Sequence, residues 1–184
     1  MKSLKMVSVL MSVLTFPSVT AKPVETKLVD KPASEYDQQD FRKAFFDAAR
    51  VFGRASCGDA PLAEMTARSS VKTGLPANVL AAEIAVESTC NPLAVSKDGG
   101  VGLLQIMPVI WAGKYDNFRE KNLLKAEDSM EVGSEILAEN IKTYGLHDGI
   151  RRYNGSGPDA ELYAVKVMAL AGEKLIPKPV MDLR

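Results

Sequence analysis

The chain has 184 residues, of which 46% are hydrophobic and 25% are charged, as expected for a globular protein with one core. Its 23 basic residues balance its 23 acidic ones, so the net charge gives no electrostatic case for nucleic-acid binding. The single histidine and two cysteines show no zinc-ligand spacing. We therefore expect neither a metal nor a cofactor.

The N-terminal segment, residues 1–21, has the anatomy of a secretory signal peptide. Lys2 and Lys5 precede an apolar run at residues 6–16, and small residues precede a cleavage point after Ala21. The run is shorter than the ~20 residues that cross a bilayer, although an uncleaved anchor or a buried helix is the alternative. Cleavage leaves 21 basic and 23 acidic residues, net charge −2, and no other possible membrane span. We predict an exported protein of the periplasm or cell envelope.

The next segments divide into a flexible leader, residues 22–38, a domain over residues 39–175, and an extended tail, residues 176–184. In the domain, apolar residues recur at spacings of three and four, which predicts helices. These helices are expected over residues 40–52, 60–72, 76–89, 107–115, 129–144 and 160–170.

Two glycine-containing stretches interrupt this helical pattern. Residues 93–105 contain Gly99, Gly100 and Gly102 among short apolar pieces, which predicts a small β-hairpin or irregular lobe. Residues 152–157 are expected to form a turn. The predicted fold class is mainly α (α+β), with a small β-hairpin lobe beside the helix at residues 76–89.

Cys57 and Cys90 are the only cysteines, and export would allow them to form a disulfide. Closing this loop of about 34 residues would stabilise the fold by on the order of 4 kcal/mol. Two buried free thiols are the alternative.

Glu87 stands near the end of an apolar helical run. Burial disfavours the charged form of a carboxyl group and raises its pKa, so the group keeps a proton that a general acid can donate. A capping or ion-paired glutamate on an ordinary helix would explain the same position. A single carboxylate does not decide between these interpretations.

An ordered set of residues begins at Glu87: Glu87-Ser88, Asn91-Pro92, Ala94-Val95-Ser96, Gly99, Gly102-Leu103, Gln105 and Met107-Pro108. This set resembles the pattern E-S-x-x-N-P-x-A-V-S followed by G-x-x-G-L-M-Q-x-M-P. That pattern is typical of the lytic transglycosylases of the soluble murein transglycosylase type, which have a lysozyme-like fold. A weaker match continues to Tyr153-Asn154 and Tyr163, so the resemblance covers roughly residues 60–170.

This resemblance implies cleavage of the β-1,4 bond between N-acetylmuramic acid and N-acetylglucosamine in peptidoglycan. Glu87 would protonate the glycosidic oxygen while the substrate's acetamido carbonyl supports the charge at C1. The resulting carboxylate would then take the proton of the muramic C6 hydroxyl, which closes on C1 as a 1,6-anhydro product. The sugar's own nucleophile replaces the second carboxylate of ordinary glycosidases.

The resemblance also implies roles for five further side chains. Ser88 would orient Glu87 or the acetamido group, Gln105 would bind polar groups of the sugar, and Met107 would pack on a sugar ring. Tyr153 would lie near the acid, and Tyr163 is a further candidate. For Met107 and both tyrosines, core packing is the alternative.

The sequence departs from the family pattern at four positions. Leu104 replaces a methionine, Ser129 replaces an asparagine, and Tyr153-Asn154-Gly155-Ser156 replaces the family's Y-N-A-G. Glu83, where the family is usually apolar, lies one turn before Glu87. If both carboxyls face the cleft, one pKa rises, but we expect Glu83 to meet solvent or a lysine. Asp98 is a conceivable second carboxylate, which would permit hydrolysis like that of goose-type lysozyme.

Two rivals therefore accompany the transglycosylase prediction: a hydrolytic lysozyme, and a non-catalytic wall-binding assembly protein of the same fold. The short chain lacks a wall-targeting repeat. We accordingly expect it to open the wall locally for a larger partner, such as a secretion or conjugation apparatus, a pilus or a phage.

Overall fold

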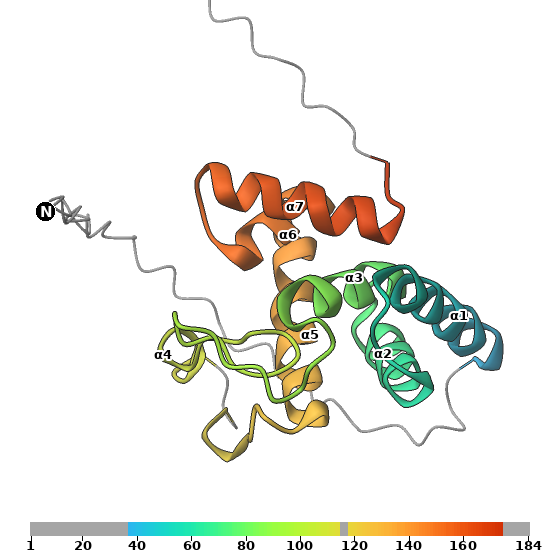
Figure 1. The fold of residues 1–184 in the computed structure, drawn as a ribbon, viewed down its shortest axis with the longest axis horizontal. Coiled ribbons are helices and arrows are strands. Elements are labelled where there is room, and N and C mark those ends of the chain that lie inside the picture. The colour runs from blue at the N-terminus through green and yellow to red at the C-terminus, as the bar shows by residue number, and fades with distance from the viewer. Residues whose placement is uncertain (1–36, 115–117, 175–184) are drawn as a thin grey trace, which may run out of the picture. The chain divides into compact units, whose positions relative to one another are not determined.

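The computed structural model describes residues 37–114 and 118–174 (Figure 1). The predicted signal peptide, nearly all of the predicted leader and the C-terminal tail lie outside the described residues. The described elements are α1 (Gln38–Ala55), α2 (Ala60–Thr73), α3 (Ala77–Ser88), α4 (Pro108–Trp111), the 3-10 helix η2 (Phe118–Glu120), α5 (Ala126–Tyr144), α6 (Leu146–Asn154) and α7 (Pro158–Ala171).

Helix α3 is the central helix and packs against α1, α2 and α7 (Figure 1). It is apolar on nearly every face, and Val79, Leu80 and Ile84 are fully buried. A helix that is hydrophobic all round belongs in a core, where no face needs to meet water. Thr89 ends the helix in the left-handed conformation, with φ 52°. The predicted helix over residues 76–89 is thus confirmed within one residue at each end.

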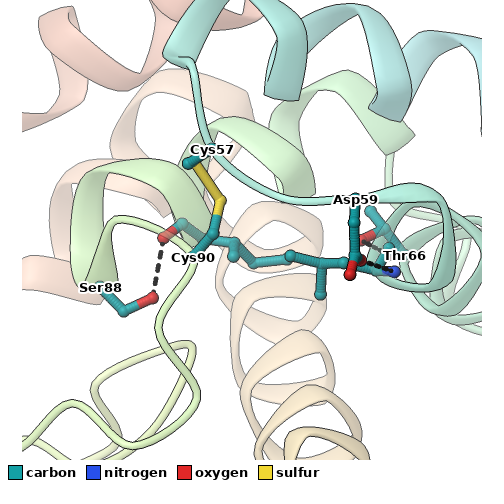
Figure 2. The surroundings of a disulfide bond; sticks show 7 residues. Cys57, Asp59, Thr66, Ser88 and Cys90 are labelled. Carbon is teal, nitrogen blue, oxygen red and sulfur yellow. Dashed lines mark hydrogen bonds between the residues drawn. A yellow bond between two sulfur atoms is a disulfide. The ribbon is translucent and has the colours of Figure 1, made fainter.

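A disulfide joins the segment after α1 to the turn after α3 (Figure 2). Cys57 and Cys90 are bonded, with their Cα atoms 5.7 Å apart. Beside this bond, the Asp59 side chain caps α2 by accepting a hydrogen bond from the backbone N–H of Leu62 at 2.9 Å. The covalent link therefore holds the end of α3 against the start of α2.

The predicted β-hairpin lobe does not form. Residues 91–106 fold instead as an irregular loop, with isolated antiparallel bridges from Val101 to Val95 and to Ile106. Gly99, Gly102 and Gln105 all have positive φ, which turns the chain too often for two strands to pair. The mainly helical part of the prediction is correct.

Helix α6 occupies part of a region that was expected to be a turn. Its packing on α5 requires Gly149, because a Cβ atom there would lie 2.6 Å from Cα of Ile141. The short apolar face of α6 and its glycine conceal the helix in the sequence. Two other helices differ from their predicted bounds. Helix α5 begins at Ala126, three residues before the predicted start, and α4 ends at Trp111, before the predicted end at residue 115.

Among the described helices, none combines the length and the apolar character that crossing a bilayer requires.

Candidate active site

Glu87 lies in the last turn of α3 and is half-buried. Its Oε1 atom accepts a hydrogen bond from the Tyr163 hydroxyl at 2.5 Å, and Tyr163 lies on α7. The packing of α7 on α3 therefore brings together two side chains that are 76 positions apart in the chain.

The environment of Glu87 favours its protonated form. Burial raises the pKa of its carboxyl group from the usual 4.5 to about 6, while the Tyr163 hydrogen bond and the Lys166 charge act in the opposite direction. A carboxyl group with this pKa keeps a substantial protonated fraction at mildly acidic pH, as a general acid requires. Lys166 on α7 was not singled out by the sequence, where it is one lysine among many.

Glu83 meets neither solvent nor a lysine, which corrects the expectation from the sequence. Its side chain is fully buried on α3, and neither carboxyl oxygen has a hydrogen-bond partner among the described residues. Burial raises the pKa of Glu83 well above its usual value, the negative charge of Glu87 raises it further, and the nearby Tyr163 hydroxyl acts in the opposite direction. Because desolvation is the largest cause of this shift, the Glu83 carboxyl is neutral and does not form an ion pair.

Tyr163, which the sequence marked only as a further candidate, contacts Glu87 directly. Burial, followed by the charges of Glu83 and Glu87, raises the pKa of its hydroxyl well above the usual value. The phenol therefore remains protonated and serves as a hydrogen-bond donor.

Tyr153, on α6, donates its hydroxyl to the carbonyl oxygen of Leu104 at 2.8 Å. It also lies near enough to Tyr163 to contribute to the raised pKa of that hydroxyl. The structure thus places Tyr153 beside the tyrosine that contacts Glu87, and ties it to the loop that follows α3.

The other predicted binding residues use their polar groups within the protein. The buried Ser88 hydroxyl donates to the carbonyl of Ile84 at 3.1 Å. The Gln105 side-chain nitrogen donates to the carbonyls of Ala94 at 3.1 Å and Gly102 at 2.9 Å. Gln105 therefore fastens the loop, whereas half-buried Met107 lies at the start of α4.

Close packing against α5 and the segment just before it fixes the 91–106 loop. A Cβ atom on Gly102 would lie 2.0 Å from the carbonyl oxygen of Leu123. The backbone N–H of Leu104 donates to the Ser129 hydroxyl at 3.3 Å. A Cβ atom on Gly133 would meet the Leu104 side chain at 2.5 Å. Leu104 and Ser129, two of the four departures from the family pattern, thus contact each other.

Four hollows on the described surface are lined by residues other than Glu87. The largest of these four has a volume of about 450 Å³ and lies beside the disulfide, lined by Leu62, Cys90 and Leu103 among others. The candidate site is defined by the hydrogen bonds of Tyr163 to Glu87 and of Tyr153 to the Leu104 carbonyl. Asp98 is exposed on the loop.

The transglycosylase SLT domain family matches residues 64–162, which include Glu83, Glu87 and Tyr153. Tyr163 follows directly after the matched range. No curated protein and no solved structure matched the chain. Because the family match spans more than half of the sequence and contains the acid-bearing helix and its loop, the chain belongs to the transglycosylase SLT domain family, whose members have a lysozyme-like fold and act on peptidoglycan.

Proposed function

We propose that this protein is a lytic transglycosylase that cleaves the bond between N-acetylmuramic acid and N-acetylglucosamine, with Glu87 as the single catalytic acid and base. The Glu87 carboxyl donates its proton to the glycosidic oxygen, and the bond from that oxygen to C1 breaks. The acetamido carbonyl oxygen of the muramic residue stabilises the positive charge at C1.

The second half of the reaction returns the proton. The Glu87 carboxylate removes the proton of the muramic C6 hydroxyl, and the C6 oxygen forms a bond to C1. The reaction gives two fragments. One begins with the free hydroxyl of N-acetylglucosamine, and the other ends in 1,6-anhydromuramic acid. No water is consumed. An intramolecular nucleophile needs little further activation because it is already close to C1.

The observation that carries this proposal is the half-buried, Tyr163-bonded carboxyl of Glu87, with its pKa raised to about 6. The Tyr163 hydroxyl supports the carboxylate after proton donation, because a hydrogen bond to the charged form stabilises it. We further propose that Tyr153 and Met107 contact the substrate, since both are half-buried beside the Glu87 loop.

A hydrolytic mechanism needs a second carboxylate that activates water or attacks C1. Glu83 is fully buried and Asp98 is exposed on the loop. Neither has the half-buried position next to Glu87 that this role requires, which supports the transglycosylase over the lysozyme.

Digestion of purified peptidoglycan, analysed by mass spectrometry, tests the proposal. We expect muropeptides that end in 1,6-anhydromuramic acid, each lighter by one water than the hydrolytic product. Glu87→Gln should lower the rate by about a thousandfold, since it removes the acid and the base together. Reducing ends alone would identify a lysozyme, and an inactive parent protein would identify a wall-binding protein.

We also propose that the protein works in the periplasm or cell envelope, where it opens the wall locally for a secretion, conjugation, pilus or phage assembly. The Cys57–Cys90 disulfide supports an oxidising compartment. Fractionation of cells that express the full chain, with and without residues 1–21, tests export. Loss of assembly function in a Glu87→Gln strain tests the local role, whereas digestion of whole sacculi in vivo without any partner would contradict it.

A further inference from the structure

Glu83 is a buried acid to which the proposed reaction assigns no role. It is fully buried on α3, one helical turn before Glu87, and its two carboxyl oxygens have no hydrogen-bond partner among the described residues. An unsatisfied buried polar group costs about 1–3 kcal/mol. An apolar side chain at this position would therefore give a more stable core, and this points to a role for the carboxyl other than stability.

The titratable groups around Glu83 come from three helices. Glu87 lies on the same helix and Tyr163 comes from α7, and both influence the charge of Glu83. Lys166 on α7 acts on Glu87, and Tyr153 on α6 acts on Tyr163. The α1 and α2 helices also pack on α3, but no titratable group from either acts on Glu83. Tyr163 is thus the group that lies near both carboxyls.

The Tyr163 hydroxyl has one proton, and it donates this proton to Glu87. Its oxygen can still accept a hydrogen bond. A neutral Glu83 has a proton to donate and lacks an acceptor among the described residues. Tyr163 lies close enough to Glu83 to influence its pKa, so a rotation of the Glu83 carboxyl would give its proton an acceptor in the Tyr163 oxygen.

We propose that Glu83 is a positioning residue that remains a neutral acid and donates a hydrogen bond to the Tyr163 oxygen, so that Glu83, Tyr163 and Glu87 form a relay. This proposal rests on the proposed function of Glu87. When Glu87 gives up its proton, the relay stabilises the carboxylate, because a hydroxyl that accepts a hydrogen bond becomes a stronger donor. Glu83 itself touches no substrate.

Two variants distinguish this role from a structural one. Glu83→Met removes the donor and keeps a side chain of similar size, so Tyr163 becomes a weaker donor and the Glu87 carboxylate is less stable. We expect the Glu87 pKa, read from the pH profile of kcat/KM, to rise by about one unit. We also expect kcat to fall about tenfold with KM unchanged. Glu83→Gln keeps an N–H donor and should return both values toward those of the parent protein.

Two further measurements do not depend on turnover. The Tm of Glu83→Met should equal or exceed that of the parent protein, which separates a loss of activity from a loss of folding. The infrared spectrum of the parent protein near neutral pH should contain the carbonyl band of a buried protonated carboxyl, and Glu83→Met should lack it. Glu139→Met removes an exposed glutamate from α5 and serves as the matched control.

The outcomes separate this inference from the proposed function. An unchanged pH profile in Glu83→Met, or a lower Glu87 pKa in both Glu83 variants, would overturn the relay while leaving Glu87 as the acid. Full activity of Glu87→Gln would instead overturn the proposed function.

Discussion

The hydroxyl of Tyr163 donates a 2.5 Å hydrogen bond to Oε1 of Glu87, which joins α7 to the end of α3. The bond connects the acid on α3 to a helix that follows it in the chain only after four intervening elements, α4, η2, α5 and α6. Any change in how α7 packs on α3 therefore alters both the position of the acid and its proton affinity.

Tyr163→Phe should raise the pKa of Glu87 above about 6, because it removes the hydrogen bond that lowers this pKa. We expect the falling limb of the kcat/KM profile to move to higher pH, and the maximal rate to fall about tenfold to a hundredfold. The pH dependence of anhydromuropeptide release measures both effects. Tyr144→Phe removes the hydroxyl of an exposed tyrosine and should leave the profile unchanged.

Glu87→Gln should change how stability depends on pH. Because folding raises the Glu87 pKa from 4.5 to about 6, the folded state binds the proton more tightly than the unfolded state. The tighter proton binding of Glu87 contributes about 2 kcal/mol to the free energy of unfolding. This contribution is fully present below about pH 4.5 and is lost as the pH rises through about 6. Urea unfolding of the parent protein and the variant should therefore agree below about pH 4.5 and diverge as the pH rises from about 4.5 to about 6, with the variant the more stable above pH 6. A constant difference across this range would contradict the raised pKa.

Removal of the disulfide should destabilise the fold. Replacing both Cys57 and Cys90 by serine frees a loop that spans 33 positions, and we expect the free energy of unfolding to fall by about 3–4 kcal/mol. Denaturant unfolding of the variant and of the parent protein, with and without reductant, measures this loss. Reductant should lower the stability of the parent protein and leave that of the variant unchanged. If reductant has no effect on the parent protein, the bond contributes nothing.

Gly102→Ala should be much more harmful than Gly99→Ala. Both glycines have positive φ, but an added Cβ atom would lie 2.0 Å from the Leu123 carbonyl oxygen at Gly102 and would meet nothing within 4 Å at Gly99. The backbone conformation alone costs about 1–2 kcal/mol, and the clash at Gly102 should add about 1–3 kcal/mol. Thermal unfolding of the two variants provides the comparison. Equal losses would show that the loop can move away from Leu123.

The sequence by itself determined the central helix and the position of Glu87 on it. The run over residues 76–89 is bounded by Pro76 and by Asn91-Pro92, so the helix could be predicted from its local pattern. The order of residues after Glu87 identified the family. These features are local along the chain, and local sequence is sufficient to define them.

Only the tertiary structure decided which groups surround the acid. Helix α3 is apolar on nearly every face, so its pattern could not show whether Glu83 faces the core or solvent. Likewise, the loop residues 93–105 have the composition of a hairpin, but the amide of Gln105 binds the loop carbonyls instead. The burial of Glu83 and the Tyr163–Glu87 hydrogen bond depend on the packing of α7 against α3, a contact between distant segments that no local pattern encodes.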